Sequence, residues 1–209
     1  MSSSYNPLIQ KLYKSRKVVL DILETRGFNI EDHKDFSINN MQSMYSNRQM
    51  DILLTHPENK NKIYVKYNIE KKIGPKILYD IIDDLYEIDE ILSEKDTLLI
   101  ISKDRVNDTQ KKLLTEFYDK DKKFINIFNL HDYLSNILDN DLVPPHRILS
   151  EEEKQQVMKE YNMLSDYEFP EIGRFDPAAL AVGIRPRQVC EIIRKSTTSI
   201  SSKAWRICV

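Results

Sequence analysis

Thr97-Leu-Leu-Ile-Ile101 is a short, nearly uninterrupted apolar run between two polar segments. A continuous run of this length is typical of a strand that is covered on both faces, as in a parallel sheet. Phe124-Ile-Asn-Ile-Phe128 predicts a further strand, and a helical pattern containing Leu113, Leu114 and Phe117 lies between the two. The alternation of strand, helix and strand indicates an α/β arrangement.

The segments before this run extend the same arrangement. Met50-Asp-Ile-Leu-Leu-Thr55 and Ile63-Tyr-Val-Lys-Tyr67 predict two strands of an antiparallel hairpin. Gly74-Pro75 begins a helical pattern whose apolar positions recur three to four residues apart; these are Ile77, Ile81, Leu85, Ile88 and Leu92. We therefore expect residues 1–141 to form an α/β domain.

Helices are expected at both ends of this domain. The first runs from Pro7 to Arg26-Gly27, with Leu8, Leu12, Val19 and Leu23 on one face. A short helix over 37–45 would bury Met41 and Met44, and another is expected over 130–138.

A second, smaller domain is expected over residues 142–209. Pro144-Pro145 breaks helices and marks the boundary. Ser150-Glu-Glu-Glu153 has the spacing of a capping box, and the helix that follows carries Val157, Met158, Tyr161 and Leu164 on its apolar side. Asp176-Pro177 caps a short helix that ends at Gly183. Val189–Arg194 and Ala204–Val209 predict two strands joined by a Ser/Thr-rich loop, which makes this domain α+β.

Composition excludes several classes of protein. The net charge of −2 argues against a whole molecule that binds nucleic acid by charge. No apolar run approaches the roughly 18 residues of a membrane span, so no membrane partner is expected. Two cysteines, Cys190 and Cys208, suit a reducing compartment and are expected to be free buried thiols. From Pro170 onward the sequence contains about seven Lys/Arg and three Asp/Glu. This excess of positive charge fits either an ordinary solvated face or docking onto an acidic partner.

The smaller domain resembles the shared fifth subunit of eukaryotic nuclear RNA polymerases, which has a shorter archaeal counterpart. The resemblance rests on an ordered series of short matches over the whole domain: Leu142-Val-Pro with His146, Leu149-Ser with Glu152-Glu153, Pro170 with Ile172, Asp176-Pro with Ala179, Gly183-Ile, Val189 with Ile192 and Arg194, and Arg206. A weaker, collinear likeness covers the first domain, through Arg16, Arg26-Gly-Phe28, Asp51-Ile-Leu and Leu98–Ile101. Arg185-Pro-Arg187 departs from the family, which commonly has a glycine in that turn; such changes indicate a divergent lineage, such as a viral copy.

The resemblance implies a non-catalytic architectural subunit without a cofactor. The smaller domain would dock on the largest polymerase subunit and its neighbours, and the first domain would form part of the lower jaw near downstream duplex DNA. Lys103 and Arg105 are the candidate DNA-facing residues, acting weakly and without sequence preference. The candidate docking residues are Pro144, His146, Asp176, Pro177, Arg194 and Arg206. The expected location is the nucleus, or a cytoplasmic factory or virion for a large DNA virus.

Two other functions remain to be weighed. The first domain resembles a degenerate restriction-endonuclease-like fold, in which Asp51 and Lys66 would stand where nucleases of the Asp…(Asp/Glu)-x-Lys type hold a metal ion. Such chemistry needs two convergent carboxylates, and Tyr64 occupies the position of the second. The scattered histidines offer no metal-ligand spacing either. The other alternative is a stand-alone DNA-binding transcription regulator, which copurification with polymerase would exclude.

Overall fold

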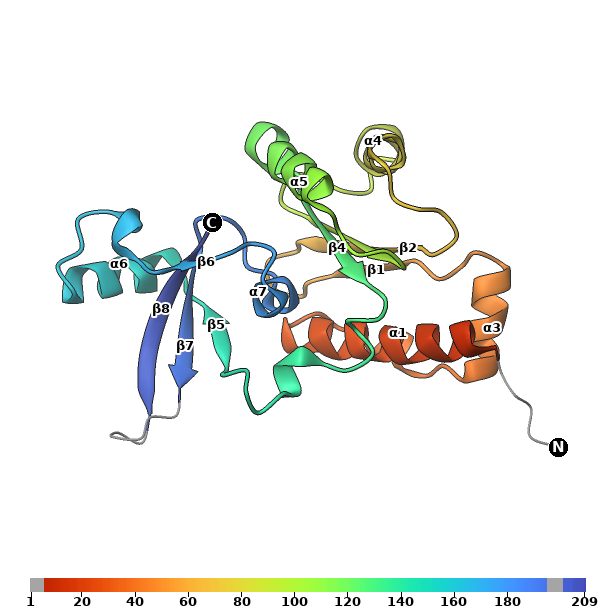
Figure 1. Cartoon of the computed structure of the whole chain (residues 1–209), viewed down its shortest axis with the longest axis horizontal. Coiled ribbons are helices and arrows are strands. Elements are labelled where there is room, and N and C mark those ends of the chain that lie inside the picture. The colour runs from red at the N-terminus through yellow and green to blue at the C-terminus, as the bar shows by residue number, and fades with distance from the viewer. Residues whose placement is uncertain (1–5, 195–200) are drawn as a thin grey trace. The chain divides into compact units, whose positions relative to one another are not determined.

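The computed structural model describes residues 6–194 and 201–209. The chain divides into two compact units, Met1–Asn136 and Ile137–Val209, which can be followed by colour in Figure 1. The sequence places the domain boundary at 141/142, whereas the units divide after Asn136. Each unit contains a four-stranded sheet, so the expected mixed α/β class is confirmed.

The N-terminal unit is built on a mixed sheet in the order β1-β2-β3-β4. Antiparallel pairing joins β1 (Ile52–Thr55) to β2 (Lys62–Asn68), as the hairpin pattern predicts. Parallel pairing joins β2 to β3 (Thr97–Ser102) and β3 to β4 (Phe124–Asn129). Every residue of β3 and of β4 is buried, because helices cover both faces of the sheet.

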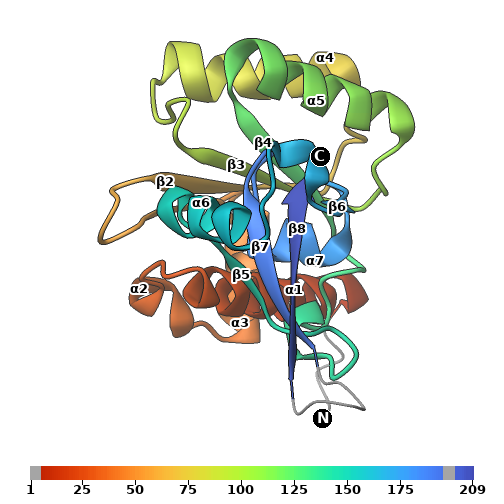
Figure 2. The same cartoon turned by 90° about the vertical axis from the view of Figure 1, so that its left-hand side faces the viewer.

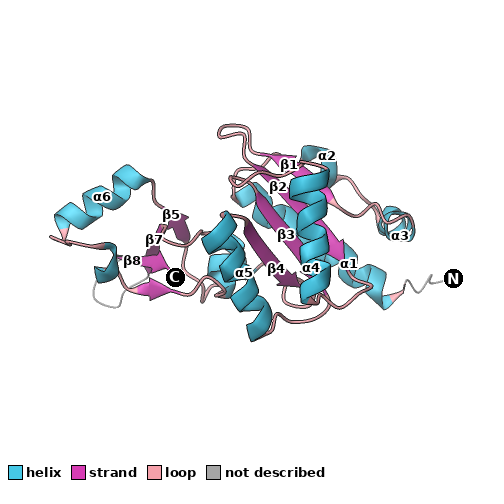
Figure 3. Ribbon diagram, turned by 90° about the horizontal axis from the view of Figure 1, so that it is seen from above, coloured by secondary structure: helices cyan, strands magenta, loops and turns pink. Residues whose placement is uncertain are grey.

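Figures 1 and 3 show α4 (Pro75–Ile82) and α5 (Asp108–Asp121) on one face of this sheet, and Figure 1 shows α1 (Pro7–Thr25) on the other. Two shorter helices, α2 (Glu31–Lys34) and α3 (Ile38–Ser46), accompany α1. The helix α1 ends where the sequence predicts. Gly27 takes a left-handed φ of 87°, and a Cβ there would lie 2.8 Å from the His56 ring.

The predicted apolar face of the helix after Gly74-Pro75 is wrong at Ile88, whose side chain is 72% exposed. After Ile82 the helix continues as a π-turn, Asp83–Ile88. A π-turn has more residues per turn than an α-helix, so a spacing of 3.6 residues no longer keeps positions on one face. Leu85 stays buried, while Ile88 rotates into solvent.

The short helix expected over 130–138 is also wrong. Its first part is a series of turns, and only Ile137–Asp139 forms a 3₁₀-helix, η2. The Leu130 N–H bonds to the carbonyl of Ser102, and the Asn129 side chain accepts the His131 N–H. These bonds hold Leu130 and His131 in a turn at the end of the sheet, and the chain forms no helix between them and Ile137.

The C-terminal unit has a second sheet in the order β5-β7-β8-β6, whose strands β7 and β8 run lengthwise in Figure 2. Its strands are β5 (His146–Ile148), β6 (Glu171–Ile172), β7 (Val189–Arg194) and β8 (Ser202–Cys208). Successive residues of β7 point to opposite faces. Cys190 and Ile192 pack with Ala179 of α7 (Pro177–Val182), whereas Val189 packs with Leu149 and Phe169 on the side of α6 (Glu151–Glu160).

Helix α6 begins with the capping box that its sequence predicts, but it ends earlier than expected. Tyr161 is its C-cap, and Asn162 takes a left-handed φ of 53°. Leu164 therefore lies beyond the helix and is exposed rather than buried. A 3₁₀-turn, η3 (Asp166–Glu168), follows it. Most of the predicted Ser/Thr-rich loop between β7 and β8 lies outside the described residues. Among the described residues no helix has the length and apolarity needed to span a bilayer.

Candidate functional site

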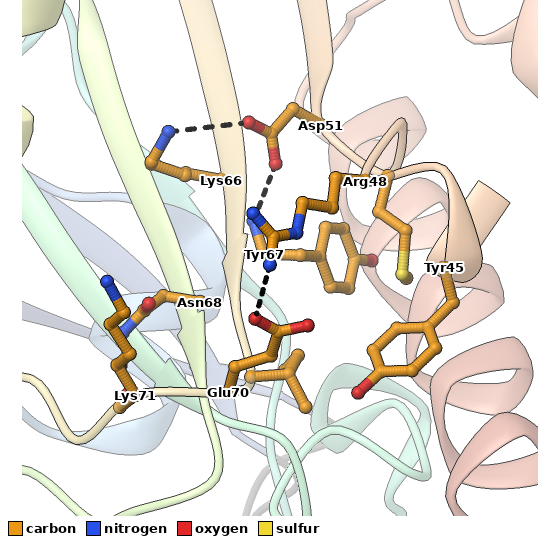
Figure 4. Close-up of a pocket in the computed structure, with 10 residues that line it drawn as sticks. Tyr45, Arg48, Asp51, Lys66, Tyr67, Asn68, Glu70 and Lys71 are labelled. Carbon is orange, nitrogen blue, oxygen red and sulfur yellow. Dashed lines mark hydrogen bonds and ion pairs between the residues drawn. The ribbon is translucent and has the colours of Figure 1, made fainter.

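Asp51 lies just before β1 on the wall of a pocket of about 350 Å³ (Figure 4). Its Oδ1 accepts the backbone N–H of Tyr67 at 2.8 Å, and its Oδ2 accepts the Tyr64 hydroxyl at 3.0 Å. The Lys66 ammonium lies 3.6 Å from Oδ2. Both carboxylate oxygens are thus engaged by donors of strand β2, which fastens the entry of β1 to its neighbour.

This arrangement lacks the ligands of a metal centre. Tyr64 stands beside Asp51, and partial burial together with the Asp51 charge raises the pKa of its hydroxyl above the ordinary value. The hydroxyl consequently keeps its proton and remains a donor to Asp51. Within residues 6–194 and 201–209 no three His, Cys, Asp or Glu side chains gather to hold an ion.

The sequence pattern did not predict a role for the buried side chain of Arg16, which lies near this pocket. Arg16 of α1 is 1% exposed; its Nη1 donates to the Met50 carbonyl at 2.6 Å, and its guanidinium lies 5.5 Å from the Phe36 ring centre. Burial lowers the pKa of Arg16, and burial raises the pKa of the neighbouring Tyr67 hydroxyl. Arg16 therefore ties α1 to the residue preceding Asp51. The signal in the sequence is a charge four residues after Leu12 on the apolar face of the helix.

Lys103 and Arg105 lie in the loop that follows β3, and both are exposed. The Arg105 Nη2 pairs with Asp132 at 3.2 Å. The Lys103 carbonyl accepts the Asn129 side-chain N–H at 2.9 Å, and a capping box on Asn107 starts α5 after the loop. The loop is therefore held at both ends while the Lys103 ammonium remains in solvent.

Three of the candidate docking residues lie along β5 and β7. The His146 Nδ1 is 2.6 Å from the Pro144 carbonyl, a contact that shapes the entry to β5. His146 is paired with Ile192 across the sheet, and Arg194 ends β7 two residues later. Pro144 and His146 are half-buried, whereas Arg194 is exposed.

The other three have roles within the unit. The Asp176 carboxylate accepts the N–H groups of Ala178 and Ala179 as the N-cap of α7, and Pro177 occupies the first turn. The Arg206 Nη1 donates to the Glu171 carbonyl at 2.7 Å and so joins β8 to β6. The structure does not bring the six candidates into one cluster of side chains; it spreads them over β5, β7, β8 and the start of α7.

Glu191 forms a charged cluster on the opposite side of β7 from Cys190. It pairs with Lys203 of β8 at 2.9 Å and with Arg147 of β5 at 3.2 Å, and Arg147 also pairs with Glu153. The hydrogen bond from Lys203, aided by Arg147, lowers the pKa of Glu191 below its ordinary value. The cluster joins three neighbouring strands.

The turn between α7 and β7 contains a non-glycine residue with left-handed backbone. Arg187 takes a left-handed φ of 71°, the conformation that favours the glycine common there in the family. Its N–H bonds to the Cys208 carbonyl, which holds the turn against β8. Arg187 therefore holds this turn in a conformation that is strained for a residue with a Cβ.

Exposed apolar residues follow α6, although the sequence pattern predicts that Leu164 lies within that helix. Leu164 and Tyr167 are 93% and 91% exposed, and Tyr161 packs against Trp205 with ring centres 5.1 Å apart. Leu164 is exposed because α6 ends before it.

The family model for the RNA polymerase Rpb5 C-terminal domain matches residues 135–208. Over nearly its whole length the chain is similar to the DNA-directed RNA polymerases I, II, and III subunit rpabc1 of Dictyostelium discoideum, with 26% identity over 96% of this chain and 98% of that protein. The corresponding subunit RPABC1 of Caenorhabditis elegans is 25% identical over 95% and 96%. The DNA-directed RNA polymerase subunit Rpo5 of Thermococcus kodakarensis is 50% identical over 64 residues, which cover 31% of this chain and 77% of that subunit.

The residues that the family model matches coincide with the C-terminal unit. The short archaeal subunit matches only a third of the chain, whereas the eukaryotic subunits match both units. The resemblance drawn from the short motifs of residues 142–209 is therefore confirmed, and this chain belongs to the family of the fifth subunit of DNA-directed RNA polymerases.

Proposed function

We propose that this chain is a non-catalytic structural subunit of a multisubunit DNA-dependent RNA polymerase, docked on the largest subunit through its C-terminal unit. The observation that carries the proposal is the coincidence of the family match, 135–208, with the compact unit Ile137–Val209. That unit has its own two-sided core and its own capped helices. The subunit works where the polymerase works, in the nucleus or, for a large DNA virus, in a cytoplasmic factory or virion.

Docking through this unit assigns different roles to the candidate residues. Asp176 and Arg206 act indirectly, because their side chains already hold α7 and β6 in place. Arg194 is exposed at the end of β7, so it is the residue whose charge a partner can meet at least cost to the fold. The excess of basic residues after Pro170 suits a partner surface that is acidic.

The N-terminal unit forms part of the lower jaw in this proposal, with Lys103 and Arg105 toward downstream duplex DNA. An origin of its fold from restriction-endonuclease-like proteins belongs to the same proposal and accounts for Asp51 and Lys66 standing together. A nuclease function has no support, because Tyr64 donates to Asp51 where a second carboxylate would be needed. A stand-alone regulator has no support from the relatives, which are named as polymerase subunits.

The experiment is capture of the purified largest subunit by immobilised full chain, by residues 137–209 and by residues 1–136. We expect the full chain and residues 137–209 to capture it at one to one, and residues 1–136 to capture none. Arg194→Glu in the full chain should weaken capture without lowering the melting temperature, and Lys159→Glu on α6 is the matched charge control. Equal capture by residues 1–136 would contradict the docking assignment.

A further inference from the structure

The parallel strands of the N-terminal unit bring two basic loops to one edge of its sheet. Asn68, Ser102 and Asn129 end β2, β3 and β4 and lie in register across the sheet. Neighbouring strands are about 4.8 Å apart, so the segments that leave these three residues start side by side. In open α/β sheets this carboxyl edge is where ligands bind.

The loop after β2 has the same construction as the loop after β3. The Asn68 side chain donates to the Lys71 carbonyl at 2.9 Å, as the Asn129 side chain donates to the Lys103 carbonyl at 2.9 Å. Each loop is thus held by an amide at the end of a strand and presents a lysine beyond it. Lys72 follows directly, and all three lysines are exposed.

These lysines are not neutralised by the unit itself. Within the described part of the chain, Lys71, Lys72 and Lys103 form no ion pair, whereas Arg105 of the same edge pairs with Asp132. Charges left unpaired at the surface are available to a partner of opposite sign.

The pocket beside Asp51 continues this basic edge. Lys71 lies on its wall together with Lys66 and Arg48, which pair with Asp51 and Glu70 (Figure 4). In Figure 4, Lys66 and Lys71 lie above and below Asn68 along the same strand and the loop that follows it. The hollow therefore has three cationic groups on its wall and two anionic ones.

We infer that the β2–α4 loop is a second nucleic-acid contact, in which Lys71 and Lys72 extend the edge begun by Lys103 and meet phosphates of the DNA duplex. This inference rests on the proposed function. Duplex DNA presents one negative charge per about 1.7 Å of its axis, so lysines in neighbouring loops each meet a phosphate without reading sequence. The exposed side of α4 and of the segment that follows it would instead repel DNA, because it carries carboxylates. These are Asp80, Asp83, Asp84, Glu87, Asp89 and Glu90.

The test uses polymerase assembled with the full-length chain and three double variants. Lys71→Glu with Lys72→Glu tests the inference, and Lys103→Glu with Arg105→Glu tests the loop after β3. Lys95→Glu with Lys120→Glu is the charge-reversal control at the opposite, amino edge of the strands, where both residues are exposed and line a hollow and Lys120 already pairs with Glu116. The readouts are copurification with polymerase and the lifetime of a stalled elongation complex, on two unrelated downstream sequences across a salt series.

We expect Lys71→Glu/Lys72→Glu to shorten the lifetime on both sequences and to flatten its dependence on log salt by about 0.9 per lost phosphate contact. The control should match the wild type, and all variants should copurify fully. Lys71→Gln/Lys72→Gln should shorten the lifetime by a smaller factor. If the double Glu variant folds poorly, the lifetime of this Gln variant tests the DNA contact instead.

A lifetime equal to that of the control, while Lys103→Glu/Arg105→Glu shortens it, would overturn the second contact and leave the proposed function standing. Loss of copurification instead would mean that Lys71 and Lys72 meet another subunit, which overturns the inference as well. A loss on one sequence alone would mean base readout and would contradict the phosphate contact. Failure of the wild-type chain to copurify would count against the proposed function itself.

Discussion

Replacing Asp51 by alanine distinguishes a structural carboxylate from the remnant of a metal site by the sign of the change in stability. In the structure Asp51 accepts two hydrogen bonds from β2 and faces Lys66. Its removal leaves the Tyr67 N–H and the Tyr64 hydroxyl without their acceptor. A carboxylate kept for metal binding has no such partners in the free protein, and its removal leaves stability unchanged or raises it.

The expected loss can be worked out from these contacts. A hydrogen bond to a charged group contributes about 1.5–3 kcal/mol when buried. The Asp51 side chain is 29% exposed, so water can replace part of each bond. The Lys66 pair is 3.6 Å long and about as exposed, and such a pair contributes about 1 kcal/mol or less. A partly exposed hydrogen bond contributes nearer to about 1 kcal/mol, the typical net value. The two bonds together therefore give about 2 kcal/mol, and we expect Asp51→Ala to lower the free energy of unfolding by about that amount.

Urea titration and thermal unfolding of the full chain, followed by circular dichroism, measure this loss. For a chain of this size about 2 kcal/mol corresponds to about 4–8 °C in melting temperature. Tyr64→Phe removes only the bond to Oδ2 and should cost about half as much. The double variant should cost less than the sum of the two single changes, because both remove the same bond.

If Asp51 served a metal site, its replacement would have a different set of effects. A working metal site would give three results together. Asp51→Ala would be as stable as the wild type, millimolar Mn²⁺ would raise the melting temperature of the wild type, and Mn²⁺ would leave the melting temperature of Asp51→Ala unchanged. Metal-dependent cleavage of DNA or RNA that disappears in Asp51→Ala would have the same meaning.

Three further predictions concern mainly the C-terminal unit. Arg187→Gly should raise its free energy of unfolding by about 1 kcal/mol, because glycine adopts a left-handed φ without strain; Lys122→Gly, at φ 55°, should do the same for the N-terminal unit, and urea titration measures both. The pKa of Glu191 is lowered by Lys203 and Arg147, so its contribution to stability is present above the ordinary carboxyl pKa of about 4.3 and is lost as pH falls through the lower folded value. Glu191→Gln should therefore lower the melting temperature at pH 7 and flatten its fall on acidification. Burial raises the pKa of Cys208 to about 11 and raises that of Cys190. Neither thiol should therefore react with a thiol-specific disulfide reagent at pH 8 until denaturant is added. Rapid reaction of the folded chain would show that the core opens.

Strand patterns were predicted well because burial alone decides them. The apolar run of β3 and the hairpin of β1 and β2 are visible in the sequence, since hydrophobic residues and β-formers occupy every position that the sheet covers. Caps were equally legible at Ser150 and Asp176, whose side chains bond to backbone groups only two or three residues away.

The errors occurred where a change of backbone geometry outweighed periodicity. A π-turn after Ile82 moved Ile88 to the surface, and the left-handed Asn162 ended α6 before Leu164. The candidate sites depend on contacts between distant segments, which a single sequence does not contain. The carboxylate of Asp51 meets Tyr64 and the Tyr67 N–H only after β1 and β2 pair. The loops that carry Lys71 and Lys103 leave the same edge of the sheet only because β2 and β3 run parallel.

A stoichiometric polymerase subunit held by its C-terminal unit should stay bound to the polymerase during purification. The most direct measurement is native purification through a tag on the chain, with each copurifying protein quantified by mass spectrometry. We expect one copy of the chain for each copy of the largest polymerase subunit, retained through high-salt washing, and the same ratio for a tagged chain reduced to residues 137–209. Recovery of the intact chain alone, with polymerase subunits absent or far below one to one, would contradict this expectation.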